Sequence, residues 1–207
     1  MIRNYLSALL VASALTSPSP PPTEVRGYGP WKLGMTREQV TAAAAEGPYS
    51  PVATTGGLET RNASFQGHQI TASFVFDASG LKHIQLWAYE GQDFAKALSA
   101  FHEAYSYLSE HLGSLESEGA PVPAGLSRDD LGSLIPAAFK TGTAQSQLGQ
   151  LPQRGSIQAQ VLKYHLHPRS PPAGAQVYAS FIHSPQLGMY LVFVYFKWPP
   201  SQSSSVG

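Results

Sequence analysis

The stretch from Gln69 to Tyr89 constrains the fold most, because it has the pattern of two β-strands joined by a tight turn. Ile70, Ala72, Phe74 and Phe76 fall on one face, with Thr71, Ser73 and Asp77 opposite them. Successive side chains of a strand point to opposite faces, so this pattern predicts a half-buried strand. Asp77-Ala78-Ser79-Gly80 then supplies a turn in which glycine can take positive φ. A second strand follows, with Ile84, Leu86 and Ala88 on its apolar face. The chain therefore contains a β-hairpin with one buried face.

The other face of the second predicted strand carries His83, Gln85, Trp87 and Tyr89. Aromatic side chains on an uncovered sheet face are typical of recognition surfaces, because they combine a large contact area with a polar edge. We therefore predict that His83, Trp87 and Tyr89 contribute to a binding surface for another protein. The alternative is that the second half of this chain folds back and buries them.

Two helices are predicted before and after this hairpin. Thr36 is a good N-cap, and Gln39 follows three residues later, which completes a capping box at the start of a helix that Gly47-Pro48 would end. After Asp93, another candidate N-cap, apolar residues recur at intervals of 4, 3, 4, 3 and 4 positions until Gly113. They are Phe94, Leu98, Phe101, Tyr105, Leu108 and Leu112. This spacing predicts a long helix packed on a sheet, and a weaker strand is expected over residues 58–65.

The second half of the chain repeats this order. A helix is expected from Ser127, with a break or kink at Pro136, and residues 141–155 are expected to form a surface loop. Three strands follow at residues 157–167, 175–181 and 189–198; the last is apolar on both faces and should be a central strand. The predicted fold class is α+β, with antiparallel sheet or sheets, helices packed on one face, and a possible duplicated α-β-β-β unit.

Composition and the two ends of the chain indicate its compartment. Residues 1–17 resemble a signal peptide whose apolar run is too short to span a bilayer, and 18–24 form a proline-rich spacer. The halves would then cover 25–113 and 114–199, with a disordered tail at 200–207. Thirteen basic residues balance thirteen acidic ones, so no nucleic-acid partner is expected, and the absence of cysteine excludes disulfides. We predict a periplasmic or extracellular protein without an integral membrane segment after signal removal.

Two motifs resemble a known family. The run Gly34-Met35-Thr36-Arg37-Glu38-Gln39-Val40 is followed by the break at Gly47-Pro48 and by Ala72-Ser73-Phe74-Val75-Phe76-Asp77-Ala78-Ser79-Gly80-Leu81. Over about residues 31–89, this pattern resembles the SmpA/OmlA family and the wider β-lactamase-inhibitor-protein-like fold. The resemblance implies a protein that binds other proteins or helps to organise the bacterial envelope, without catalysis. This chain departs from the pattern because it has no cysteine for a lipid anchor and because it adds a second half.

Histidines supply the main candidate for chemistry. His165 and His167 lie two apart on a predicted strand, so their rings should share a face, and His183 is on a neighbouring predicted strand. Converging imidazoles could bind zinc and support a secreted hydrolase or another metal-dependent enzyme. No carboxylate is paired with them locally, and Pro168 ends the strand, which favours a solvated strand end. We therefore expect no metal, cofactor or catalytic residue, and the preferred function is a secreted or periplasmic protein-binding module of the bacterial cell envelope.

Overall fold

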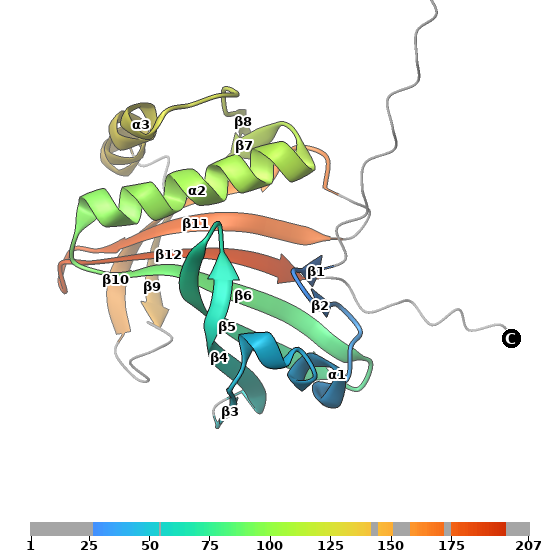
Figure 1. Ribbon diagram of the computed structural model, residues 1–207. Coiled ribbons are helices and arrows are strands. Elements are labelled where there is room, and N and C mark those ends of the chain that lie inside the picture. Colours follow the sequence, from blue (N-terminus) through green and yellow to red (C-terminus); the bar gives the residue numbers. More distant parts are fainter. Residues whose placement is uncertain (1–26, 54, 142–144, 151–157, 172–174, 198–207) are drawn as a thin grey trace, which may run out of the picture.

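One large antiparallel sheet dominates the molecule. The computed structural model describes residues 27–53, 55–141, 145–150, 158–171 and 175–197, so the predicted signal, spacer and tail lie outside the described residues (Figure 1). Ten strands form the sheet, in the order β3-β4-β5-β6-β12-β11-β10-β7-β8, and β9 also pairs with β10. The strands of its first half are β3 (Tyr49–Val52), β4 (Gly57–Phe65), β5 (His68–Asp77) and β6 (Gly80–Gly91). Those of its second half are β7 (Leu115–Ser117), β8 (Ala120–Pro121), β9 (Gln145–Gln150), β10 (Gln158–Pro168), β11 (Gln176–Ser184) and β12 (Met189–Lys197).

The two halves of the chain meet in the middle of this sheet. Strands β4, β5 and β6 form one meander and β10, β11 and β12 form another, and β6 pairs antiparallel with β12. Each half thus contributes its last strand to the central pair, with its earlier strands placed outward in reverse order. The apolar strand β12 lies between β6 and β11, which confirms that it is central. The predicted α+β class, with helices packed against an antiparallel sheet, is confirmed.

The helices are α1 (Arg37–Thr41), α2 (Phe94–Leu112) and α3 (Arg128–Thr141), with a short 3₁₀ helix η1 (Ala44–Glu46). Helix α2 lies along β11 and contacts β6, β12, β11 and β10, and α3 packs on α2 and β10 (Figure 1). Their buried residues, from Val40 on α1 to Ala138 on α3, all belong to the main hydrophobic core. The described helices therefore pack against one side of the sheet, which we call the helix face.

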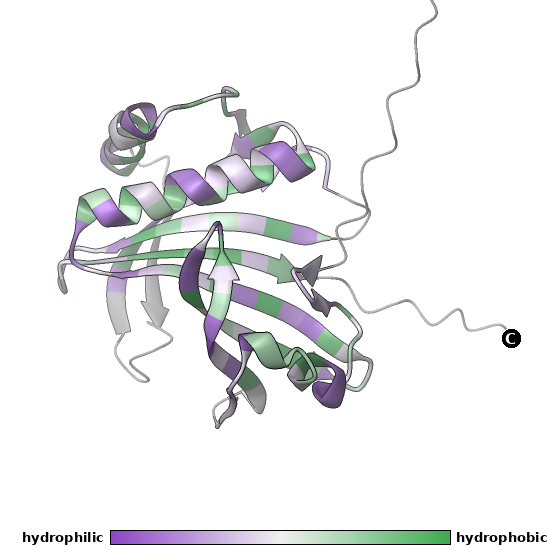
Figure 2. Ribbon diagram, in the orientation of Figure 1, coloured by the Kyte–Doolittle hydropathy of each residue, from purple (hydrophilic) through white to green (hydrophobic). Residues whose placement is uncertain are grey.

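Helix α2 has the bounds that its apolar spacing predicts. The side chain of Asp93 accepts a hydrogen bond from the backbone N–H of Lys96 at its start, and Gly113 ends it with a positive φ of 78°. Figure 2 shows hydrophobic and hydrophilic residues distributed around this helix and alternating along the strands. Phe101 is fully buried, with its ring 5.6 Å from that of Phe181 on β11. Burial of one face of α2 is therefore the main contact between helix and sheet.

Other elements differ from the sequence-based predictions. Helix α1 has the predicted capping box but ends at Thr41, and η1 follows after Ala42 and Ala43. Helix α3 continues through Pro136, because Ile135 and Ala138 are buried on either side of it and hold both segments against the core. Within the predicted loop 141–155, residues 145–150 form strand β9, for which the glutamine-rich sequence gives no alternation of polar and apolar residues.

Short strands complete the fold. A two-stranded sheet pairs β1 (Gly27–Tyr28) with β2 (Trp31–Lys32), and Trp31 is almost fully buried in the main core. Strands β7 and β8 form a small hairpin that pairs with the end of β10. In the part of the chain that the structure describes, none of the helices combines the length and apolar character needed to span a membrane.

Candidate functional site

The side of the sheet opposite the helices is the candidate site, and we call it the reverse face. It is formed by alternate residues of the central strands, between the positions that enter the main core. The backbone register places these residues in rows that cross the strands. Three such rows are Lys163-Ile182-Leu191-Glu90, His165-Ser180-Phe193-Trp87 and Tyr178-Tyr195-Gln85-Ser73, and a fourth is Gln176-Lys197-His83-Val75.

Aromatic rings pack against one another across these rows. The ring centroids of Tyr178 and Tyr195 are 4.8 Å apart with an interplanar angle of 30°, and Phe193 lies 6.2 Å from Tyr178. His165 meets the same tyrosine edge-on at 5.5 Å. Tyr178, Tyr195 and Phe193 are all partly exposed. They form a continuous amphipathic surface, in which rings pack beside hydroxyl and imidazole groups.

Two histidines on this face are held by neutral hydroxyl groups. The hydroxyl of Tyr195 lies 2.8 Å from Nδ1 of His83, and Oγ of the buried Ser180 lies 2.6 Å from Nδ1 of His165. Burial lowers the pKa of both imidazoles, and nearby lysines lower it further, Lys197 for His83 and Lys163 for His165. Both pKa shifts favour neutral rings. The reverse face is thus polar without strong charge in its centre.

The tyrosine hydroxyls are also kept neutral. Burial, with the nearby Tyr195 as a second cause, raises the pKa of Tyr178 to about 12. Burial likewise raises the pKa of Tyr195. Such hydroxyls remain hydrogen-bond donors near neutral pH and are poor general bases.

Trp87 lies on the reverse face as predicted, but only 7% of it is exposed. Its indole N–H donates to Oγ of Ser73 at 3.3 Å, and its ring is 5.8 Å from that of Phe193. Together with Val161, Ile182 and Leu191 it forms a second, smaller hydrophobic cluster. Trp87 therefore packs beneath the partly exposed Phe193 and offers little surface of its own.

Tyr89 lies on the helix face, which differs from the alternation that the sequence suggests. The register of β6 and β12 shifts between Val192 and Phe193, so that Val192 opposes Tyr89 while Phe193 opposes Trp87. This β-bulge inserts one extra residue, Ala88, and turns the side chain of Tyr89 to the other face. There its hydroxyl accepts a hydrogen bond from the backbone N–H of Asp93 at 3.0 Å. Of the three predicted contact residues, only His83 and Trp87 share the reverse face.

The histidines considered for metal binding also lie on two faces. His165 and His167 line one groove on the reverse face, as their spacing predicts. His183 lies on the helix face, where its ring stacks on that of Tyr190 at 4.6 Å. His167 is 3.5 Å from a carboxylate oxygen of Glu116, an ion pair when the imidazole is protonated. Among the described residues, no three or more histidine, aspartate and glutamate side chains are grouped so that they could hold a metal ion.

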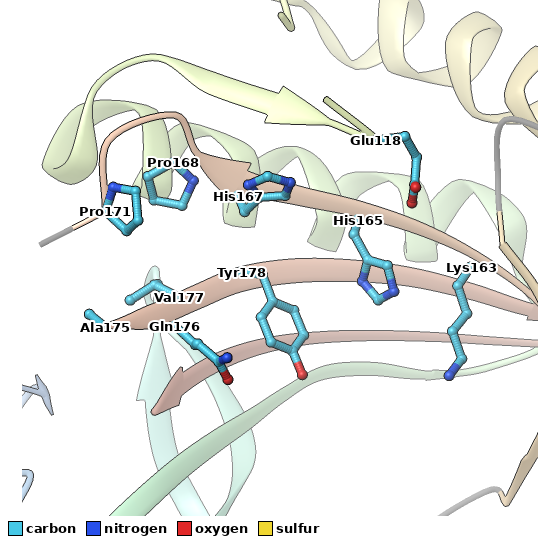
Figure 3. A pocket seen from close by; sticks show the side chains of 10 residues that line it. All are labelled: Glu118, Lys163, His165, His167, Pro168, Pro171, Ala175, Gln176, Val177 and Tyr178. Atoms are coloured by element: carbon cyan, nitrogen blue, oxygen red, sulfur yellow. The ribbon is translucent and has the colours of Figure 1, made fainter. Parts of the chain in front are cut away.

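A groove of about 540 Å³ lies where the reverse face meets the β7–β8 hairpin. Figure 3 shows Lys163, His165 and Tyr178 extending to the same side of their strands, with Glu118 beside them. Apolar side chains of Pro168, Pro171 and Val177 line its other end. The groove opens to solvent and continues the aromatic surface through Tyr178.

Sequence reasoning missed the β11 and β12 members of this site. Tyr178 and Ser180 occupy the positions between Val177, Ala179 and Phe181, so the alternation that predicts β11 could have identified them. The pairing of β6 with β12, which brings Tyr195 beside His83, has no local signal because these residues are 112 positions apart.

Comparison with protein-family models, with curated proteins and with solved structures returned no match. The class of protein that the structure itself defines is an α+β protein with one extended antiparallel sheet.

Proposed function

We propose that this chain is a secreted or periplasmic, non-catalytic protein-binding module of the bacterial cell envelope, and that its partner docks on the reverse face. The observation that carries this proposal is the partly exposed aromatic surface of Tyr178, Tyr195 and Phe193. Aromatic residues are enriched at protein interfaces and supply many of the residues that dominate binding energy. The site residues of this proposal are His83 and the three aromatic residues, with Trp87 as support.

The charge distribution favours a protein partner over a charged polymer. Across the four rows of the reverse face, the only lysine, arginine, aspartate or glutamate residues are Lys163, Lys197 and Glu90. A protein that binds nucleic acid needs a clustered basic surface, because phosphate contacts dominate its affinity. Neutral tyrosine, glutamine and histidine groups instead match the polar groups of a protein surface.

The rigid support of this face favours recognition over catalysis. Ser180 and the hydroxyl of Tyr195 hold the two imidazoles at their Nδ1 atoms, and both partners are neutral groups. A general base is usually oriented by a carboxylate that stabilises its protonated form, whereas hydroxyl partners here accompany lowered pKa values. The enzyme alternative also required His165, His167 and His183 to converge, and these rings lie on opposite faces. The binding function is therefore the better supported.

Site-specific photo-crosslinking in the source organism tests this proposal. Benzoylphenylalanine replaces Tyr178 or Phe193 on the reverse face, or Glu110 on the exposed side of α2 as a matched control. We expect the first two positions to yield a crosslinked product of one discrete protein mass, while Glu110 yields none. Equal products from all three positions would show that the reverse face has no special role.

Cell fractionation tests the proposed location separately. Mature protein that lacks about the first 17 residues should be recovered from the periplasm or the medium. Recovery of the uncleaved chain from the cytosol would overturn the location without deciding the role of the reverse face.

A further inference from the structure

The groove beside the β7–β8 hairpin has an uneven charge distribution that bears on the chemistry of the partner. Lys163 and His165 lie two residues apart on β10 and extend into it together with Tyr178 (Figure 3). These side chains bring an ammonium group, an imidazole and a phenol to one end of the groove. All three can donate hydrogen bonds, so this end suits a ligand that accepts them.

The orientation of His165 strengthens this donor set. Oγ of Ser180 is within 2.6 Å of its Nδ1, and a serine hydroxyl that donates to this nitrogen leaves the proton of a neutral ring on Nε2. Ser180 is fully buried, which fixes the ring by packing as well as by hydrogen bonding. The remaining nitrogen can then donate to an acceptor in the groove.

Two acidic residues lie near the groove, and their surroundings differ. Glu116 has one carboxylate oxygen 3.5 Å from Nδ1 of His167 and the other 3.8 Å from Nε of Arg169, so its charge is balanced within the β7–β10 pairing. Glu118 is exposed in the turn between β7 and β8, at the rim of the groove. Water screens an exposed charge more strongly than one in a partly buried groove.

Resting on the proposed function, we propose that this groove binds an aspartate or glutamate side chain of the protein partner, held by Lys163 and His165. The groove is continuous with the partner surface because Tyr178 both lines it and stacks on Tyr195. A protein segment that lies over the aromatic rows would therefore reach it without leaving the sheet. The exposed Pro171, at the other end, would contact apolar atoms of the same segment.

Physical chemistry supports a carboxylate in particular. Lys163 is partly exposed in the groove, and burial lowers the pKa of its ammonium group. A carboxylate can accept a charge-assisted hydrogen bond from an ammonium group, which is stronger than a bond between neutral groups. The same carboxylate also favours the protonated form of His165 and should raise its pKa on binding.

Selection from a displayed library of random peptides tests this inference with the purified protein. Peptides selected on the wild type should be enriched in aspartate or glutamate, and replacement of that residue by asparagine or glutamine should weaken binding about tenfold. The charge reversal Lys163→Glu should remove the acidic preference and select basic peptides instead. Lys197→Glu is the matched control, since Lys197 also lies on the reverse face but outside the groove, and it should keep the acidic preference at the groove position.

The outcomes separate this inference from the proposed function. The selected peptides could compete with one another and lose binding to Phe193→Ser, yet show no preference for acidic residues. That result would overturn the proposed carboxylate site and leave the proposed binding face intact. Peptides that bind equally well to wild type and Phe193→Ser, or no selected peptides at all, would count against both. Thermal unfolding of each variant identifies any that fails to fold, and in that case Lys163→Gln replaces Lys163→Glu.

The imidazole signals of His165 in NMR spectra provide a second readout. A bound acidic peptide should raise the pKa of His165, whereas its amide analogue should leave that pKa unchanged. The groups facing this ring are Lys163, Glu118, His167, Ser180 and Tyr178, and they are the same in both measurements. An equal response to both peptides would contradict carboxylate binding at this position.

Discussion

Tyr195 on β12 and His83 on β6 form a hydrogen bond on the reverse face, with 2.8 Å between the tyrosine hydroxyl and Nδ1 of the imidazole. Nε2 of His83 is buried and has no hydrogen-bond partner among the described residues. Loss of the hydroxyl would leave both ring nitrogens without a partner, and an unsatisfied buried polar group costs more than an average hydrogen bond contributes.

Tyr195→Phe should therefore lower the free energy of unfolding by about 1–2 kcal/mol, measured by urea denaturation. The double variant with His83→Phe as well is the control, because replacing both partners by apolar groups removes the unsatisfied atoms. The double variant should lose less stability than the sum of the losses in Tyr195→Phe and His83→Phe. Additive losses would show that the two side chains do not interact.

The pH dependence of stability provides a second prediction for single residues. Burial lowers the pKa of His165 from its usual 6.5, so the unfolded chain takes up this proton at a higher pH than the folded one. Stability contributed by the neutral ring is therefore complete above pH 6.5 and is lost as the pH falls through the lowered pKa. His165→Gln, which keeps a polar group beside Ser180, should flatten the slope of stability against pH just below 6.5. An unchanged slope would contradict the burial of this ring.

Among the elements, α2 makes the largest contribution to the helix face. Phe101 is fully buried, 5.6 Å from the ring of Phe181 and 6.1 Å from that of Tyr164, and its truncation leaves a cavity between helix and sheet. We expect Phe101→Ala to lower the free energy of unfolding by about 3–5 kcal/mol. Glu110→Ala on the exposed side of the same helix should change it by less than about 0.5 kcal/mol. Similar effects of the two variants would show that α2 is not packed as described.

Helix α3 carries a proline at an interior position. Pro136 lacks the N–H that would bond to the preceding turn, and neighbouring buried residues keep the helix intact. Pro136→Ala restores the donor, and we expect it to raise the free energy of unfolding by about 1–3 kcal/mol despite the greater freedom of the unfolded chain. A loss of stability in thermal and urea unfolding would mean that the proline ring itself packs in the fold.

These elements also show what the sequence could predict. The hairpin turn at Asp77–Gly80, the bounds of α2 and the central place of β12 follow from period and capping, which are local properties. The bulge that reverses Tyr89 depends on pairing with β12, more than a hundred residues away in sequence. No local pattern encodes such a register shift, so the face of His83 and Trp87 could be predicted from the sequence, whereas the face of Tyr89 depends on tertiary structure.

For the whole molecule, the pairing of β6 with β12 determines whether the two halves of the chain unfold together. The two halves share both a sheet and one main core. We therefore expect a single cooperative transition, in which far-UV circular dichroism and tryptophan fluorescence change together with urea concentration. Two separate transitions would show that residues 25–113 and 114–199 fold independently, as separate domains would.

The same arrangement creates the reverse face, because its rows run from β10 through β11 and β12 to β6 and so combine both halves. From the predicted signal peptide at residues 1–17, we propose that this surface acts in the periplasm or outside the cell. Tyr178, Tyr195 and Phe193 would then bind the partner, with the groove at Lys163 selecting an acidic side chain.

The dissociation constant of the crosslinked partner, purified and titrated against reverse-face variants, decides whether this surface is the binding site. Tyr178→Ser combined with Phe193→Ser should raise Kd at least about a hundredfold, as loss of central aromatic contacts does at other interfaces. Glu110→Ala should leave Kd unchanged, and the melting temperatures confirm that both variants are folded. An unchanged Kd in the folded double variant would contradict a partner site on the reverse face.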